Sequence, residues 1–185
     1  GTWDDVWIDQ EGDVSIKQIQ IVPETSLGNT MCNLEVWNKT GSDLQVKIVA
    51  SIWDDGKTLV NVEKQVVLKG EKKYIDNLTL NSEMLEYWTP GKEGNPKLYT
   101  LNVKVKDDET GKILYSKDER FGYRNITVEG KDVKLNGNKI FFRAENIAYV
   151  RALNRWEDVM FDEDWIRQFI RSVIQDHNFN YIRFH

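Results

Sequence analysis

The sequence predicts a mainly β protein, and three observations support this class. Apolar and polar residues alternate with a period of two in one short segment after another up to residue 121. Polar turns rich in Gly, Asn and Asp separate these segments. A helical repeat of apolar residues appears only beyond residue 160. The chain has 185 residues, enough for one large domain or for a smaller domain and a piece of another.

The clearest expected strand is Leu44 to Trp53, because every second residue from Leu44 to Ile52 is apolar. Pro23 is expected to end the first strand, since proline cannot donate to a ladder. About seven short strands over roughly 110 residues are typical of an immunoglobulin-like antiparallel β-sandwich. The expected strands are Val14–Val22, Thr30–Trp37, Leu44–Trp53, Val62–Leu68, Lys73–Leu80, Leu98–Val105 and Ile113–Phe121.

A hairpin is expected just after the last of these strands. Asn136-Gly137 is the strongest short hairpin signal in the chain, because both residues tolerate a positive φ. It separates the alternating residues Val133–Leu135 from the apolar run Ile140–Phe142. The stretch from Asn81 to Pro96, by contrast, is long and irregular.

The last 45 residues change pattern and predict a strand, a loop, a helix and a second strand. The first strand is expected over Phe141–Ala148 and the last over Asn180–Phe184. Asp162 is a suitable N-cap for the helix, and acidic residues follow it where the helix dipole favours them. Asn178 is expected to end the helix. The expected apolar face comprises Ile166, Phe169, Ile170, Val173, Ile174 and His177.

Composition excludes several classes of function. The net charge of −5 disfavours a nucleic-acid partner, and no apolar run approaches the length of a membrane span. One cysteine, Cys32, excludes an internal disulfide and leaves the compartment open. Two histidines and one cysteine far apart give no metal-ligand spacing, and no glycine-rich phosphate loop occurs. No metal and no cofactor is therefore expected.

Several motifs resemble family 2 glycoside hydrolases, the group of the β-galactosidases, β-mannosidases and β-glucuronidases. In that family an F-G-[FY]-R strand closes an immunoglobulin-like domain, and an N-G hairpin leads into the first strand of a (β/α)8 barrel. A W-[ST]-P motif precedes the penultimate strand of the sandwich. The matching segments are Phe121–Arg124, Val133–Gly137, Ile140–Arg143 with Asn146, and Trp88–Pro90 with Pro96–Leu101.

The resemblance implies a plan of three parts for this chain. Residues 1–9 resemble the last strand of a preceding sugar-binding jelly-roll domain, residues 10–126 form the sandwich, and residues 127–185 form the truncated N-terminal part of a catalytic barrel. Glycoside hydrolysis needs two carboxyl groups. In the family both are glutamates on the fourth and seventh barrel strands, which this chain lacks. The chain alone is therefore expected to be inactive.

Barrel enzymes bind substrate at the carboxyl ends of their strands, which here fall near residues 145–149 and 183–185. The resemblance implies a supporting catalytic role for Arg183, whose equivalent holds the carboxylate of the nucleophile. Asn146 matches the asparagine after the first strand, although Ala144 replaces the usual glycine. Glu145 is unusual at its position, and an ion pair with Arg143 or Arg151 is expected for it. The expected substrate-binding residues are Asn146, Tyr149, Trp156 and His185.

Two other functions remain open from the sequence. The chain could be a stand-alone immunoglobulin-like carbohydrate-binding or adhesion module with a helical appendage, or the sandwich could serve only to pack domains together. The expected partner is an oligosaccharide or glycoside, with no nucleic acid and no membrane. Exposed faces of residues 127–185 are a candidate oligomer interface. A polysaccharide-degrading role would favour a periplasmic or secreted location over the cytoplasm.

Overall fold

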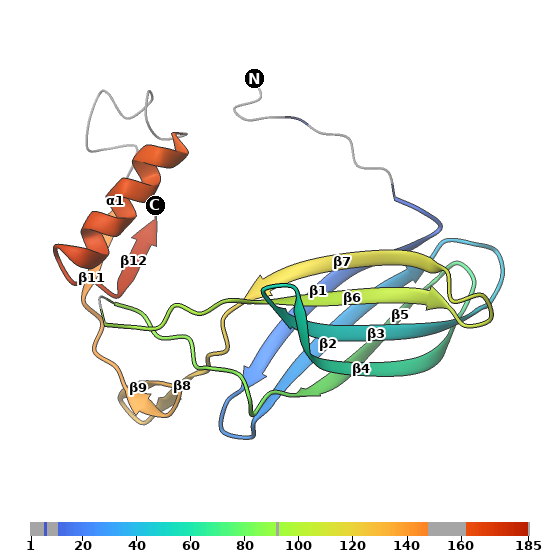
Figure 1. Cartoon of the computed structure of the whole chain (residues 1–185), viewed down its shortest axis with the longest axis horizontal. Helices are drawn as coiled ribbons and strands as arrows, with labels where there is room; N and C mark the ends of the chain where they lie inside the picture. Colours follow the sequence, from blue (N-terminus) through green and yellow to red (C-terminus); the bar gives the residue numbers. More distant parts are fainter. Residues whose placement is uncertain (1–5, 7–10, 92, 148–161, 185) are drawn as a thin grey trace. The chain divides into compact units, whose positions relative to one another are not determined.

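The computed structural model describes residues 6, 11–91, 93–147 and 162–184, with only the backbone described for Ile147, 173–175 and Phe184. These residues fall into two compact units (Figure 1). The first runs to Leu85 and continues with Leu98–Tyr123, and the second contains Glu86–Lys97 and the chain from Arg124 onward. The strand expected over residues 1–9 lies outside the described residues, apart from Val6.

The first unit consists of two antiparallel sheets. In the smaller sheet β2 (Asn29–Asn38) lies between β1 (Val14–Glu24) and β5 (Lys72–Asn81). The larger sheet has the order β4-β3-β6-β7, which comprises Lys57–Leu68, Leu44–Asp54, Tyr99–Asp107 and Ile113–Phe121. The seven strands expected between residues 14 and 121 are therefore confirmed, with ends shifted by up to five residues.

The hydrophobic core lies between these two sheets. Val46, Ile48, Ala50 and Ile52 of β3 are at most 1% exposed, which confirms that these alternate residues face the core, while Val49 and Ser51 on the opposite face are also largely buried, at 8% and 7% exposed. The smaller sheet contributes Cys32, Leu34 and Val36 from alternate positions of β2. Because both sheets bury one face against the same core, the unit is a β-sandwich. Burial raises the pKa of the Cys32 thiol to about 12, as expected for an inert thiol.

The expectation that Pro23 ends the first strand is wrong. β1 continues through Pro23 to Glu24, and Pro23 is paired with Thr30 of β2. The reason is that β1 is at the edge of its sheet, where only one neighbour requires ladder hydrogen bonds. Proline is tolerated at an edge because its position without an N–H can face the side on which no strand needs a hydrogen-bond donor.

β4 begins earlier than the sequence predicts, at Lys57 instead of Val62. It follows β3 through a two-residue turn in which Asp55 and Gly56 have φ values of 45° and 78°. Positive φ at both positions matches the twist of a tight hairpin, so pairing starts immediately with Asp54 opposite Lys57.

The second unit contains a small antiparallel sheet of three strands in the order β10-β9-β8. Asn136 and Gly137 have φ values of 51° and 80°, which confirms the Asn-Gly hairpin between β9 (Asp132–Leu135) and β10 (Asn138–Lys139). β8 (Ile126–Glu129) is an additional strand that the sequence does not predict. Its four residues alternate apolar and polar, but the run is short and all four are exposed in the structure.

The chain then forms a parallel strand pair connected through a helix. β11 (Ala144–Ile147) pairs in parallel with β12 (Tyr181–Phe184), and α1 (Glu163–Gln175) lies between them in the chain. β11 is half as long as the expected strand Phe141–Ala148, since residues 141–143 precede the ladder without joining it. The order strand, helix, parallel strand is a βαβ unit.

Asp162 caps α1 as predicted, because its side chain accepts hydrogen bonds from the backbone N–H groups of Asp164 and Trp165. The expected place of His177 on the apolar face of this helix is wrong. The helix ends at Gln175, and His177 instead stacks on Phe179 with 5.9 Å between ring centroids. With 13 residues, α1 falls short of a membrane crossing, and no other described helix is long and apolar enough for one.

Candidate functional site

The candidate site is the carboxyl end of β11 and β12, where the structure brings Asn146 and Arg183 together. The parallel register pairs the Cα atom of Asn146 with that of Arg183. Both side chains are exposed, and both residues lie next to the last paired residue of their strand. In α/β proteins the carboxyl ends of parallel strands are the usual place for ligand binding.

Glu145 lies beside this pair but does not make the expected contact with Arg143. Its carboxylate accepts a hydrogen bond of 2.8 Å from the backbone N–H of Asn146. Arg143 donates instead to Asn178, at 2.6 Å to the backbone oxygen and 3.2 Å to Oδ1. The other expected partner, Arg151, lies outside the described residues. Glu145 thus holds the backbone next to Asn146.

Three of the expected substrate-binding residues, Tyr149, Trp156 and His185, lie outside the described residues. Their roles stay predictions. Of the expected set, the structure therefore places Asn146, together with the supporting residue Arg183.

The side chains described at the carboxyl ends of β11 and β12 are suited to binding a ligand. The guanidinium of Arg183 presents a planar set of donors suited to a carboxylate, and the amide of Asn146 can both donate and accept. Glu145 is the single carboxylate among the described residues 144–147 and 181–184. Hydrolysis of a glycosidic bond by the usual route requires two. These residues can hold a charged or hydroxylated group but cannot by themselves supply an acid and a nucleophile.

Three segments that carry the sequence motifs meet inside the second unit. The Arg124 guanidinium carbon lies 4.3 Å from the centroid of the Trp88 ring. The side chain of Asn136 donates to the backbone oxygen of Trp88 at 3.1 Å and accepts from the backbone N–H of Asn125 at 2.9 Å. The hairpin asparagine therefore fixes the irregular stretch as well as its own turn.

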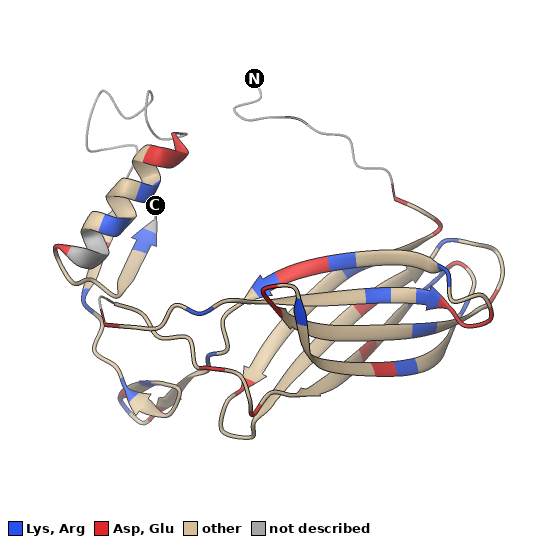
Figure 2. Ribbon diagram, viewed as in Figure 1, with Lys and Arg blue, Asp and Glu red and all other residues tan. Residues whose placement is uncertain are grey.

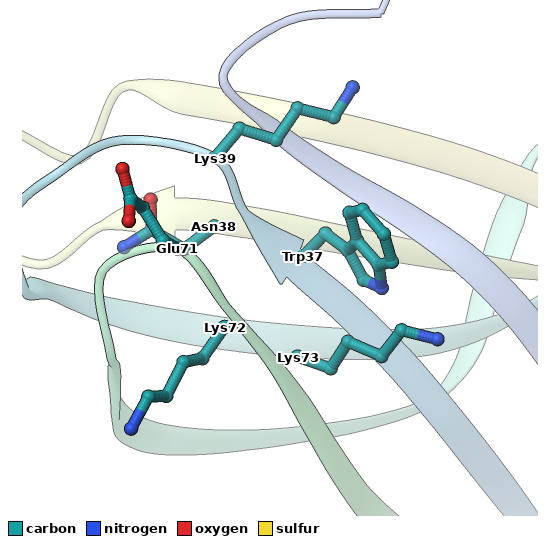
Figure 3. Close-up of a pocket in the computed structure, with 6 residues that line it drawn as sticks. All are labelled: Trp37, Asn38, Lys39, Glu71, Lys72 and Lys73. Atoms are coloured by element: carbon teal, nitrogen blue, oxygen red, sulfur yellow. The ribbon is translucent and has the colours of Figure 1, made fainter.

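A separate feature of the sandwich is a shallow hollow of about 370 Å³ on the smaller sheet, between the ends of β2 and β5 (Figure 3). Trp37 is its one aromatic lining residue. The ammonium groups of Lys73 and Lys17 lie 4.9 Å and 5.5 Å from the centroid of the Trp37 ring. The lining residues are Trp37, Asn38, Lys39, Glu71, Lys72 and Lys73.

Two carboxylates organise the lysines around this hollow. Glu35 accepts hydrogen bonds from Lys73 at 2.9 Å and from the Trp37 indole at 3.0 Å, and these donors lower its pKa. Glu11 accepts from Lys17 and Lys39, which lower its pKa from 4.5 to about 2. The two ammonium groups lie over the Trp37 ring, so this hollow can attract an acidic group, and a sugar that stacks on the indole must displace a lysine side chain.

Charges elsewhere on the sandwich are mixed. Figure 2 shows acidic and basic residues interspersed along its strands. Lys47 pairs with Glu63 on the neighbouring strand, and Lys64 of β4 pairs with Asp76 of β5 in the other sheet. In the described ranges no three His, Cys, Asp or Glu side chains gather closely enough to hold a metal ion.

The position of Trp37 on the outer face of the sandwich could have been predicted from the sequence, although the sequence-based prediction treated it only as part of a strand. Trp37 is out of phase with Cys32, Leu34 and Val36, so it must face away from the core. Asn180 begins an Asn-x-[IVF]-Arg segment that resembles the family, but the motif does not imply the structural role of its side chain, which replaces a backbone partner that only the folded chain reveals.

Solved structures with the same fold are glycoside hydrolases of family 2. A β-galacturonidase from Eisenbergiella tayi has a TM-score of 0.61 at 22% identity, with 76% of this chain and 23% of that chain covered. An exo-chitosanase from Amycolatopsis orientalis has a TM-score of 0.67 at 15% identity and covers 95% of this chain and 20% of its own. A β-glucuronidase from Parabacteroides merdae has a TM-score of 0.64 at 21% identity, with 93% and 21% covered.

This chain therefore spans about a fifth of the length of the solved structures it matches. A search of curated protein sequences finds no significant match. The family model described as glycosyl hydrolases family 2 matches residues 14–124, which include all seven strands of the sandwich. Because this match covers more than half of the chain, the protein belongs to glycosyl hydrolase family 2.

Proposed function

We propose that this chain is a segment of a glycoside hydrolase that acts on β-linked sugars in carbohydrate breakdown. The sandwich is an immunoglobulin-like domain that supports a catalytic (β/α)8 barrel, and residues 127–185 are the N-terminal part of that barrel. Residues 1–9 are the last strand of a preceding jelly-roll domain. The family match over residues 14–124 carries this proposal. It is supported by the parallel register that pairs Asn146 with Arg183.

In this proposal Arg183 is the residue of this chain nearest to the chemistry. Its guanidinium holds the carboxylate of a nucleophile that another strand of the barrel supplies, and a bidentate contact fixes the orientation of that carboxylate. Asn146, Tyr149, Trp156 and His185 bind the sugar. The acid and the nucleophile are glutamates on the fourth and seventh barrel strands, so the segment alone is inactive.

The test is hydrolysis of a panel of nitrophenyl glycosides by this chain and by a version extended through a complete barrel. The structural relatives named above are a galacturonidase, a glucuronidase and an exo-chitosanase. The panel therefore contains acidic, amino and neutral β-glycosides. Activity of the extended version alone is the expected result and identifies the sugar. Hydrolysis by the 185-residue chain itself would contradict the proposal.

The role of Arg183 is tested in the extended version. Arg183→Ala is expected to lower kcat by a factor of roughly 100 or more with a smaller change in KM, because the lost contact orients a reacting group. Arg183→Lys keeps the charge but loses the bidentate geometry, so it is expected to recover only part of the activity. Full activity of Arg183→Ala would remove Arg183 from the site.

A second candidate function is a carbohydrate-binding module, and the Trp37 hollow is the observation that favours it. Binding of acidic and neutral oligosaccharides to this chain is measured by NMR titration. Trp37→Ala would abolish such binding, whereas the matched control Ile75→Ala, a residue that is 74% exposed on the same sheet, would not. Sugar binding by this chain together with an inactive extended version would favour the module over the hydrolase.

A further inference from the structure

The segments that lead into β11 and β12 are tied together by side chains before the ladder begins. Asn180 lies one residue before β12, and Arg143 lies one residue before β11. The backbone oxygen of Arg143 accepts from the N–H groups of Asn180 at 3.0 Å and of Tyr181 at 3.3 Å. Four further hydrogen bonds join the two segments through side chains.

The side chain of Asn180 pairs with the opposite backbone as a peptide group would. Its Nδ2 donates to the backbone oxygen of Phe141 at 3.0 Å, and its Oδ1 accepts from the backbone N–H of Arg143 at 2.9 Å. In a parallel ladder a residue donates to one carbonyl of its neighbour and accepts from the amide two residues further on. The amide of Asn180 uses this same spacing, so it fits one register of the two segments.

Arg143 holds the same junction from the other side. Its Nε donates to the backbone oxygen of Asn178 at 2.6 Å, and an Nη donates to Oδ1 of Asn178 at 3.2 Å. Asn178 has a φ of 55°, in the left-handed region, which turns its carbonyl and side chain toward one donor group. The planar guanidinium satisfies both acceptors at once.

The strand pair needs such a device because it is short. β11 and β12 have four residues each, and the described side chains of β11 are exposed, so little buried surface selects one register. A slip by two residues keeps every side chain on its face. It would nevertheless carry Arg183 roughly 6.6 Å along the strand from Asn146.

We propose that Asn180 and Arg143 are positioning residues that lock the register of β11 and β12 and thereby hold Asn146 beside Arg183. The importance of the Asn146–Arg183 pairing for activity rests on the proposed function, in which the hydrolase uses Arg183. The register lock itself does not depend on any sugar chemistry.

The lock is tested by disulfide trapping in the 185-residue chain. The in-register pair Asn146→Cys/Arg183→Cys brings two Cα atoms to adjacent positions, within the range that a disulfide spans. The pair Asn146→Cys/Tyr181→Cys is two residues out of register. Cys32 is buried in the sandwich, where its raised pKa keeps the thiol unreactive. The fraction cross-linked under mild oxidation is read by mass spectrometry.

Each pair is measured in three backgrounds: native, Asn180→Asp and Arg143→Lys. Asn180→Asp has nearly the same shape but turns an oxygen instead of a donor toward the Phe141 carbonyl. The in-register pair is expected to dominate in the native background. The ratio of in-register to out-of-register cross-linking is expected to fall about tenfold in Asn180→Asp and by less in Arg143→Lys.

The matched control is Ile182→Val, which loosens β12 without touching the lock. A fall of the ratio in the lock variants, with no fall in Ile182→Val, supports the proposal. An unchanged ratio in Asn180→Asp, or an equal fall in Ile182→Val, overturns it. Because no sugar is present, these outcomes are independent of the glycoside panel, so failure of the lock and failure of the proposed function are told apart.

Discussion

The sandwich and the β11–α1–β12 segment use similar local signals but reach different degrees of burial. In the sandwich two sheets cover each other, and the alternating residues of β3 are almost completely buried. Around β11 and β12, Phe141, Phe142 and Tyr181 are 70%, 48% and 46% exposed. A strand pair with a helix provides too little surface to bury its own faces. The comparison teaches that a second covering layer, more than the pattern of a single strand, decides where a core forms.

The largest expected difference between the two regions is in hydrogen exchange. Amides of β3 and β6 lie in the centre of the larger sheet and are expected to exchange through global unfolding. Amides of β11 and β12 are expected to exchange through local opening, roughly a thousandfold faster or more. Exchange read by NMR or mass spectrometry tests this. Equal protection of both regions would show that they open with the same free energy, contrary to this prediction.

Removal of a core side chain is expected to destabilise the sandwich strongly. Ile52→Ala replaces a side chain that is fully buried between the sheets, so the free energy of unfolding should fall by about 2–5 kcal/mol. Ile75→Ala on the exposed face of β5 is the matched control, with an expected change of about 0.5 kcal/mol or less. Urea unfolding gives both values, and similar losses would mean that the two faces of the sandwich are not distinct.

Loss of the N-cap of α1 is expected to destabilise the helical segment without affecting the sandwich. Asp162→Ala removes the acceptor of two backbone N–H groups and should reduce the stability of the helix by about 0.5–2 kcal/mol. Asp162→Asn keeps a capping oxygen and is expected to lose far less. The signal is faster exchange of the α1 amides with unchanged exchange in β3. A change in β3 as well would mean that the two regions unfold together.

The smallest effect is expected at the surface of the sandwich. Lys17 and Lys39 hold the pKa of Glu11 at about 2, below its usual 4.5, so the folded state binds its proton less tightly than the unfolded chain does. The resulting stabilisation is fully present above pH 4.5 and is lost as the pH falls toward 2. Salt weakens it.

Glu11→Gln is therefore expected to be slightly less stable than the native chain at neutral pH and equal to it near pH 2. Thermal unfolding at several pH values measures the difference. Glu109→Gln, at an exposed position in the turn after β6, is the matched control. A difference between Glu11→Gln and the native chain that persists unchanged to pH 2 would contradict this assignment.

The sandwich was predictable because each strand buries one face. Period two in Leu44–Ile52 identifies both the strand and its core residues, and Asp55-Gly56 marks its turn. The error at Pro23 concerns the position of β1 within its sheet, which is a property of the assembled strands. β8 was missed although Ile126 and Val128 alternate with polar residues, because a period of two over four residues is too short a signal and the strand buries no face.

The candidate site was predictable in part. The motif resemblance selected Arg183 and Asn146, and the structure makes them neighbours. The hydrogen bonds of Asn180 and Arg143 were not predictable, because they join segments separated by 37 residues and replace backbone partners. The roles of Tyr149, Trp156 and His185 stay predictions, because these residues lie outside the described ranges.

The strand order of the larger sheet has a consequence for how this protein folds during its synthesis on the ribosome. β3 pairs with β6, so Ile52 meets a residue 49 positions later in the sequence, Leu101. β1, β2 and β5 are complete once Asn81 has been synthesised. In the larger sheet, however, β3 lacks its second neighbour, β6, until Asp107 has emerged. Until then β3 exposes a central row of apolar side chains with a single partner strand. A nascent chain stalled before β6 is therefore expected to be a chaperone client, and release from the chaperone should follow once β6 and β7 have left the exit tunnel.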